Sequence, residues 1–268
     1  MKHADVCYFS GTGNTLLALK AFLDRIKEQN VSLSFYPMEE TTPAALEVED
    51  TLILAFPVAY QSTYPFIWRF LRQLNPGDGQ PVYMLDTLAG FSGGIVGPVR
   101  RLLRKRGYRP VGAKEIIMPS NLRTGEYSPD NDSSSIDKGK GKASAFAEAV
   151  LKGQARWTYY PVFEDCFYLL FQLVRLSINP VSQRILRFSF PKLIAERCTS
   201  CGICVDLCPV KNIRMEDNPV HGHRCQICLR CVAFCPYSAV RILKMKKTHY
   251  RAVDLRQCRT QLPFSRIN

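Results

Sequence analysis

The sequence predicts an α/β fold built on a parallel sheet, followed by a smaller cysteine-rich α+β domain. Apolar runs that suit buried strands alternate with helical patterns through the first half of the chain. A glycine-rich turn follows the first of these runs, and one cysteine spacing occurs twice near the end of the chain. With 268 residues the chain is long enough for one domain of about 150 residues and a second, smaller one.

The first predicted strand covers residues 5–9, and the helix after it covers residues 16–27. The turn between them consists of Ser10, Gly11, Thr12, Gly13, Asn14 and Thr15. Glycines let backbone N–H groups approach a phosphate, hydroxyl groups donate to its oxygens, and the helix N-terminus adds a positive dipole. The turn lacks both the lysine of a Walker-type loop and the Gly-x-Gly-x-x-Gly fingerprint of dinucleotide sites. It predicts a phosphate site of another class.

The pattern Ser10-x-Thr12-Gly13-x-Thr15 resembles the FMN phosphate loop of flavodoxins. That resemblance implies a flavodoxin-like doubly wound parallel sheet with FMN bound outside the carboxyl ends of the strands. We therefore expect FMN as a cofactor. A chance hydroxyl-rich turn is the alternative interpretation.

Two later loops are expected to contact the flavin ring because each follows a predicted buried strand, at residues 51–56 and 81–85. The expected contacts are Pro57, Val58, Ala59 and Tyr60 from the loop at 57–65, and Thr87, Leu88, Ala89, Gly90, Phe91, Gly93 and Gly94 from the loop at 86–94. For Tyr60 and Phe91, ordinary loop packing is the alternative. A helix at 94–105, a strand at 112–118 and a helix at 143–152 complete the predicted domain.

The stretch between residues 122 and 142 is rich in serine, aspartate, glycine and lysine. Because it offers almost nothing to bury, it predicts a mobile surface loop. Such a loop is either a lid over a site or an ordinary insertion.

The repeated cysteine run predicts two cubane iron–sulfur clusters, because thiolates suit iron in a sulfide cage. The first run is Cys198, Cys201, Cys204 and Cys208 followed by Pro209, and the second is Cys225, Cys228, Cys231 and Cys235 followed by Pro236. Structural zinc and disulfides are the alternatives. Zinc sites use two separated pairs of ligands, and disulfides need an oxidising compartment.

Residues 192–243 resemble the bacterial two-cluster ferredoxins. In proteins with this run, the fourth cysteine of each motif ligates the other cluster. The resemblance therefore implies one cluster on Cys198, Cys201, Cys204 and Cys235, and a second on Cys225, Cys228, Cys231 and Cys208. It also implies two [4Fe-4S] clusters per chain.

The whole chain resembles the flavodoxin/ferredoxin fusion proteins of anaerobic bacteria and archaea. That resemblance implies an FMN domain at residues 1–155, a helical linker at 156–191, a two-cluster domain at 192–245 and a basic tail at 246–268. Fusion proteins of this kind carry a Met-Pro-x-Asn turn after a strand, which implies that Asn121 approaches the cofactor.

The expected function is electron transfer, because cubane clusters pass single electrons whereas FMN accepts one or two. Electrons would pass from a low-potential donor through the clusters to FMN, and on to a protein or a small molecule. The alternative is a flavin-dependent reductase of an organic substrate, with the clusters as an internal wire. No catalytic side chains are assigned, since the four histidines are scattered at His3, His221, His223 and His249.

The chain has a formal net charge of +13, and one basic run covers residues 100–109. This run is expected either to dock an acidic redox partner, such as a ferredoxin, flavodoxin or reductase, or to form a merely solvated helix. No nucleic-acid module accompanies it, so no nucleic-acid partner is expected.

The longest apolar stretch, at residues 167–176, falls short of the ~20 residues that span a bilayer. Residues 157–191 are expected to form one or two helices that pack the domains together, with contact to a membrane surface as the alternative. No signal peptide is visible, so the cytoplasm is the expected location.

Overall fold

The computed structural model describes residues 1–59, 61–90, 94–121, 129–158, 166, 169–170, 191–242 and 250–254. The chain divides into two compact units. The first comprises Met1–Ser10, Asn14–Pro119 and Asp130–Phe171, and the second comprises Gly11–Gly13, Ser120–Pro129 and Gln172–Asn268.

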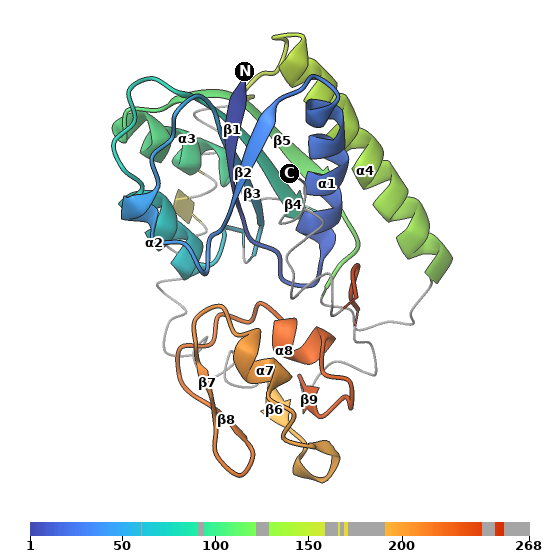
Figure 1. The fold of residues 1–268 in the computed structure, drawn as a ribbon. Coiled ribbons are helices and arrows are strands. Elements are labelled where there is room, and N and C mark those ends of the chain that lie inside the picture. Colours follow the sequence, from blue (N-terminus) through green and yellow to red (C-terminus); the bar gives the residue numbers. More distant parts are fainter. Residues whose placement is uncertain are drawn as a thin grey trace. The chain divides into compact units, whose positions relative to one another are not determined.

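A five-stranded parallel sheet forms the centre of the first unit (Figure 1). Its strands are β1 (His3–Tyr8), β2 (Ser32–Pro37), β3 (Leu52–Pro57), β4 (Pro81–Leu88) and β5 (Arg109–Ile117). They lie in the order β2-β1-β3-β4-β5, and every neighbouring pair is parallel. This is the flavodoxin-like order of doubly wound sheets, so the predicted fold class is confirmed.

Helices cover both faces of the sheet (Figure 1). Helices α1 (Asn14–Lys27) and α4 (Pro129–Leu151) lie on one face, where the rings of Phe22 and Phe146 are 5.6 Å apart between centroids. Helices α2 (Pro65–Gln73) and α3 (Val96–Lys105) lie on the other face, and a 3-10 turn, η1 (Pro43–Ala45), precedes β3. Because both faces are covered, all six residues of β3 are buried.

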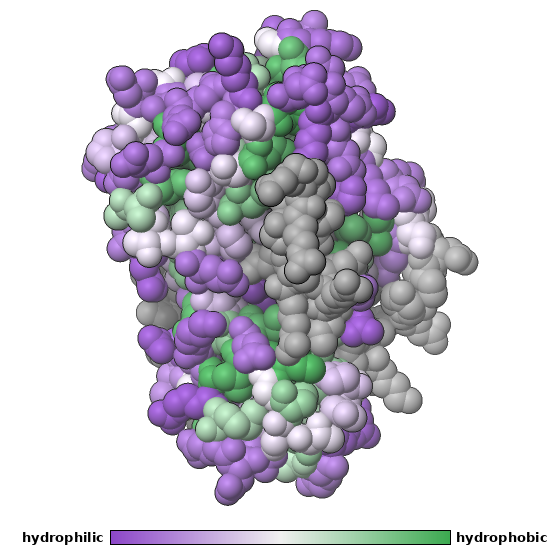
Figure 2. Space-filling model, in the orientation of Figure 1, coloured by the Kyte–Doolittle hydropathy of each residue, from purple (hydrophilic) through white to green (hydrophobic). Residues whose placement is uncertain are grey.

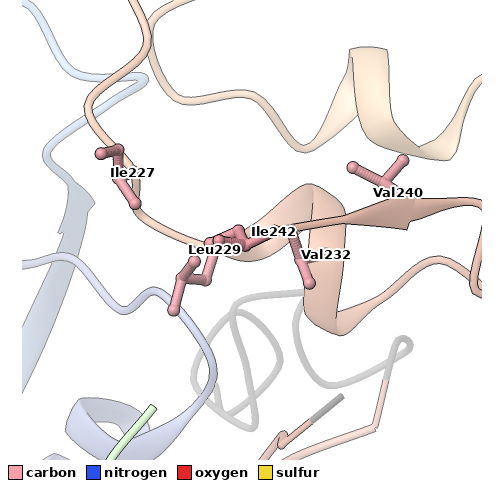
Figure 3. Packing of buried hydrophobic residues seen from close by; sticks show 5 residues of the cluster. All are labelled: Ile227, Leu229, Val232, Val240 and Ile242. Carbon is pink, nitrogen blue, oxygen red and sulfur yellow. The ribbon is translucent and has the colours of Figure 1, made fainter. Parts of the chain in front are cut away.

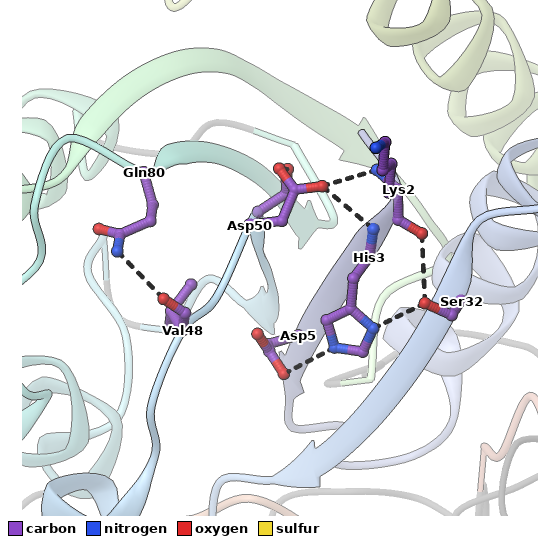
Figure 4. Close-up of polar contacts among 8 residues, drawn as sticks. Lys2, His3, Asp5, Ser32, Val48, Asp50 and Gln80 are labelled. Atoms are coloured by element: carbon purple, nitrogen blue, oxygen red, sulfur yellow. Dashed lines mark hydrogen bonds and ion pairs between the residues drawn. The ribbon is translucent and has the colours of Figure 1, made fainter.

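Polar contacts fasten the amino ends of the strands (Figure 4). The Asp50 carboxylate accepts hydrogen bonds from the backbone N–H groups of Lys2 (2.6 Å) and His3 (3.1 Å). The His3 ring bonds to Ser32 (2.8 Å) and Asp5 (3.2 Å). In a parallel sheet this edge lies opposite the carboxyl ends of the strands, so these residues support the sheet rather than a ligand at the carboxyl edge.

The expected surface loop at residues 122–142 is wrong from Pro129 onward, because α4 begins there. Proline suits the first turn of a helix, where its missing N–H costs nothing. At Gly139 a Cβ would meet the Met118 side chain and the Ile117 carbonyl oxygen, so glycine lets the helix lie close to the sheet. The side of α4 visible in Figure 2 is mostly hydrophilic, which explains why composition predicted a loop. Residues 122–128 lie outside the described residues.

Three other elements differ from the sequence expectations. Strand β4 continues to Leu88, so the expected loop at 86–94 begins three residues later than expected. Strand β2 and helix α2 were not predicted. Of the expected linker helices, only Cys166, Leu169 and Leu170 are described; they are helical and exposed.

The second unit contains an internal repeat whose two halves carry the two cysteine runs. Each half has one short helix, α7 (Ile203–Asp206) or α8 (Arg230–Ala233). Positive φ angles recur at matching positions, with 50°, 78° and 48° at Ser200, Gly202 and Lys211, and 55°, 68° and 51° at Ile227, Leu229 and Ser238. The two halves therefore share one backbone conformation around their cysteines.

Two small antiparallel ladders and an apolar cluster complete the second unit (Figures 1 and 3). Strand β6 (Lys192–Leu193) pairs with β9 (Val240–Arg241), and β7 (Ile213–Met215) pairs with β8 (Pro219–His221); a 3-10 turn, η2 (Ala195–Arg197), precedes Cys198. The buried cluster comprises Ile227, Leu229, Val232, Val240 and Ile242. Three cysteines, Cys225, Cys231 and Cys235, pack against it. Within the described residues, no helix is both long and apolar enough to cross a membrane.

Candidate cofactor sites

The predicted phosphate-binding turn is buried, and several of its backbone N–H groups donate to no described residue. Ser10, Thr12, Asn14 and Thr15 are each less than a tenth exposed. Gly13 has a φ of +107°, a conformation that side chains with a Cβ rarely adopt. Within the described part of the chain, the N–H groups of Gly11, Thr12 and Thr15 donate no hydrogen bond. A phosphate at the start of α1 would satisfy such donors.

Side-chain hydrogen bonds hold the residues of this turn in place. The Thr12 hydroxyl donates to Oδ1 of Asn121 (2.8 Å), the residue expected to approach the cofactor. The Asn14 amide donates to the carbonyl oxygen of Pro119 (2.8 Å), and the hydroxyls of Thr15 and Thr87 lie 2.7 Å apart. The turn is therefore connected to β4 and to the segment that follows β5.

The segment after β3 is bonded to the end of β4 and to the end of β3 itself. The N–H of Val58 donates to the carbonyl oxygen of Thr87 (2.8 Å), and the Thr63 hydroxyl donates to that of Pro57 (2.9 Å). Ala59 and Ser62 exchange backbone hydrogen bonds of 2.8 and 3.0 Å. Among the other expected ring contacts, Leu88 is buried, Ala89 and Gly90 are exposed, and Gly94 has a φ of +85°. Tyr60, Phe91 and Gly93 lie outside the described residues.

Asp86 is an ionisable residue that the sequence analysis placed in a loop and did not single out. It lies within β4 and is fully buried, and neither carboxyl oxygen has a hydrogen-bond partner in the described structure. Burial raises the pKa of this carboxyl well above its usual value, and the nearby Glu115 raises it further. The only signal in the sequence was one acidic residue inside an otherwise apolar strand.

The cysteines of the second unit line two separate pockets, and each pocket combines the two runs. One pocket is lined by Cys198, Cys201 and Cys204 of the first run and by Cys235 of the second. The other is lined by Cys225, Cys228 and Cys231 of the second run and by Cys208 of the first. The fold thus brings together the two groups of four that the ferredoxin resemblance implied.

Backbone N–H groups donate to the same two sulfur positions in each half of the repeat. Ser200 and Ile227 donate to the sulfur two residues before them, Cys198 and Cys225, at 3.4 Å in each case. Asn212 and Ala239 donate to the sulfur four residues before them, Cys208 and Cys235, at 3.2 Å in each case. Such bonds favour thiolate sulfur and tune the reduction potential of a bound cluster.

The apo thiols resist ionisation. Burial raises the pKa of Cys204 to about 11 and that of Cys228 to about 12. Thiolates at these positions consequently require metal to stabilise them. The described cysteines form no disulfide. Within the described residues, no three His, Cys, Asp or Glu side chains lie close enough to share a single metal ion.

Three polar residues at the pocket with Cys208 could not be assigned a role from the cysteine spacing. Asn212 and Arg230 are buried, and His221 is partly buried, with its Nε2 buried and unpartnered in the described structure. All three line the pocket that contains Cys208. A single histidine, asparagine or arginine lacks the regular spacing that made the cysteines recognisable.

Comparison with known proteins finds a family match for the segment that contains the two cysteine runs. Residues 190–236 match the family described as 4Fe-4S dicluster domain. No curated protein matches the chain.

Among solved structures, a flavodoxin from the domain Archaea is 16% identical with a TM-score of 0.40, and the match covers 56% of this chain and 99% of that one. Flavodoxin 2 from Bacillus cereus is also 16% identical, with a TM-score of 0.42 and coverage of 56% and 98%. Rubredoxin oxygen:oxidoreductase from Desulfovibrio gigas is 12% identical, with a TM-score of 0.42 and coverage of 58% and 37%. The strand order, rather than these matches, carries the fold assignment.

The strand order makes the first unit flavodoxin-like, and the family match makes residues 190–236 an iron–sulfur segment. The two-part organisation of the flavodoxin/ferredoxin fusion proteins, expected from the sequence, is thereby confirmed. The chain thus combines a flavodoxin-like fold with a segment that matches the 4Fe-4S dicluster family.

Proposed function

We propose that this protein carries electrons from a low-potential donor through two [4Fe-4S] clusters to FMN, and from FMN to a protein or small-molecule acceptor. The observation that carries the proposal is the pair of cysteine pockets, each containing three cysteines of one run and the fourth of the other. Four thiolates around one pocket are the ligand set of a cubane cluster. Single-electron cofactors beside a flavin allow electrons supplied singly to leave in pairs.

The proposed cluster ligands follow the two pockets. Cluster one is held by Cys198, Cys201, Cys204 and Cys235, and cluster two by Cys225, Cys228, Cys231 and Cys208. Because each cluster joins both halves of the repeat, metal binding would also stabilise the fold of a segment that has only a small apolar core. The proposal also divides the chain into an FMN domain at residues 1–155, a helical linker at 156–191, a two-cluster domain at 192–245 and a basic tail at 246–268.

The proposed FMN phosphate site is the turn from Ser10 to Thr15. Its unsatisfied N–H groups and buried hydroxyls suit a phosphate dianion, and no cationic side chain is needed there because the helix dipole is favourable. The ring would lie against the segments that contain Pro57, Val58, Ala59 and Tyr60, and Thr87, Leu88, Ala89, Gly90, Phe91, Gly93 and Gly94. When bound, the flavin supplies one- and two-electron chemistry.

The proposed docking surface for a redox partner is the basic end of α3. Arg101, Arg104, Lys105 and Arg109 are exposed there. Clustered positive charge attracts an acidic partner over distances of about a Debye length and raises the association rate. An oxygen-free cytoplasm is the setting that such clusters would suit.

Paired cysteine substitutions test the crossed ligand sets. Cys208→Ser and Cys225→Ser are each expected to remove about half of the iron and sulfide of the anaerobically purified protein. If both residues ligate cluster two, the double variant loses no more iron than either single variant. The matched double variant, Cys208→Ser with Cys198→Ser, then loses nearly all of it. The reverse pattern would assign each cluster to a single run and contradict the proposal.

A further inference from the structure

The two cysteine pockets differ in charge although their backbones repeat. The pocket with Cys208 is also lined by His221, Asn212 and Arg230. None of the described residues that line the pocket with Cys198 is basic. At the position of the repeat where α8 begins with Arg230, helix α7 begins with Ile203. The same local fold thus provides two different electrostatic environments.

His221 presents a polar atom that needs a partner. Its Nε2 is buried, and no group in the described structure forms a hydrogen bond with it. A buried polar atom without a partner costs free energy, and this cost is removed when a ligand supplies the missing group. His221 lines the pocket together with four cysteines, so a sulfur of the cluster held there is an acceptor within the same pocket.

The backbone holds His221 at the wall of this pocket. In the β7–β8 ladder it is paired with Ile213, and the N–H of the next residue, Gly222, donates to the Asn212 carbonyl oxygen (2.8 Å). The Asn212 side chain in turn donates to the Gly222 carbonyl oxygen (3.2 Å) and accepts from the N–H of Arg224 (2.7 Å). Since the Asn212 N–H also donates to the Cys208 sulfur, one residue positions both the histidine and a cluster ligand.

We propose that His221 is a positioning and tuning residue that donates a hydrogen bond from Nε2 to a sulfur of the cluster on Cys208, Cys225, Cys228 and Cys231. The proposal rests on the assignment of a cluster to this pocket. An N–H donor at a cluster sulfur stabilises the extra negative charge of the reduced state, and so raises the reduction potential. Cluster two is therefore the first to be reduced, and cluster one the second.

An EPR-monitored potentiometric titration of the anaerobic holoprotein tests this. Wild type shows two reduction steps. In His221→Leu only the step at higher potential moves, to lower potential, because the donor is lost. Loss of this hydrogen bond is expected to change the equilibrium constant for reduction of the cluster about tenfold. For a one-electron couple this corresponds to a shift of ~59 mV in the reduction potential.

Two further variants separate hydrogen bonding from other effects. His221→Gln can place its side-chain amide N–H near the position of Nε2, so it is expected to restore most of the wild-type potential. His223→Leu removes an exposed histidine two residues away and is expected to leave both steps unchanged.

Three results would overturn the proposal. These are an unchanged upper step in His221→Leu, an equal shift of both steps, or a shift in His221→Gln as large as that in His221→Leu. Loss of about half of the iron in His221→Leu would instead make this residue essential for holding the cluster, which also contradicts a tuning role. A wild-type protein with iron for fewer than two clusters would contradict the proposed function itself, so iron and sulfide analysis separates the two failures.

Discussion

At the scale of single residues, Asp86 has the most unusual environment of the described acidic groups. Its carboxyl group is fully buried and has no hydrogen-bond partner among the described residues, and burial together with Glu115 raises its pKa well above the usual value. The folded protein therefore holds the proton more tightly than the unfolded chain does. The protonated Asp86 carboxyl therefore contributes its full stabilisation below the unfolded pKa of about 4. This contribution becomes progressively smaller as pH rises towards the folded pKa.

Asp86→Asn is accordingly expected to gain stability relative to wild type as pH rises. Between pH 5 and the folded pKa the gain grows by up to about 1.4 kcal/mol per pH unit. Denaturant unfolding of the holoprotein at pH 5 and pH 8 measures it. Asp78→Asn, at an exposed position, is the matched control and should show no such growth. A difference between Asp86→Asn and wild type that is the same at both pH values would contradict a buried neutral carboxyl.

A second residue-scale prediction concerns the phosphate turn. Thr12 is buried and donates to Asn121, so the long side chain in Thr12→Arg should fill the phosphate position. The purified variant is expected to contain iron and sulfide at wild-type levels but little or no FMN. Thr42→Arg, at an exposed position outside the turn, is the control and should keep its flavin. Full FMN content in Thr12→Arg would show that the turn is wrongly assigned.

The residues that sequence analysis identified, and those that it missed, differ in one physical respect. The cysteines and the Ser10–Thr15 turn were recognisable because a cluster and a phosphate demand several donors at fixed spacing. Asp86 and His221 are single residues that belong to no such pattern. Their importance depends on burial and on neighbours that the fold brings together, such as Glu115 and Cys208, and neither feature leaves a spacing pattern.

At the scale of elements, α4 shows how packing overrides composition. Its glycines, serines and aspartates predicted a loop, yet Gly139 lets the helix approach β5 and Phe146 contacts α1. The buried strands β3 and β4 were predictable because parallel strands covered on both faces are continuously apolar. Strand β2 was missed because it is a partly exposed edge strand without such a run.

Two glycines of α4 provide a matched test of this packing. Gly139→Val places a branched side chain against Met118 and the Ile117 carbonyl oxygen, and is expected to cost about 1–3 kcal/mol of stability. At Gly141 a Cβ would have no atom within 4 Å, so Gly141→Val should change stability by less than about 0.5 kcal/mol. Denaturant unfolding of both variants measures the difference. Equal effects would show that α4 does not pack closely through Gly139.

At the scale of the whole molecule, one unit has a flavodoxin-like sheet and the other contains a segment of the 4Fe-4S dicluster family. The first has the strand order of flavodoxin-like doubly wound sheets, and the proposed flavin site lies at the carboxyl ends of its strands. The second has an internal repeat with two cysteine pockets, each of which takes cysteines from both runs. The two pockets differ in that His221 and Arg230 line the one with Cys208. The parallel sheet and the cysteine-rich segment could both be predicted from the sequence, since strand runs and cysteine runs occupy different parts of the chain. The place of His221 at one pocket could not, because the β7–β8 ladder brings it there.

The most direct test of the proposed cofactor content is an anaerobic reductive titration of the purified protein, followed by absorbance and combined with iron, sulfide and FMN analysis. Two [4Fe-4S] clusters and one FMN predict about eight irons, about eight sulfides and one FMN per chain, with uptake of about four electrons. Uptake of about two electrons with no FMN, or about four irons per chain, would contradict the account.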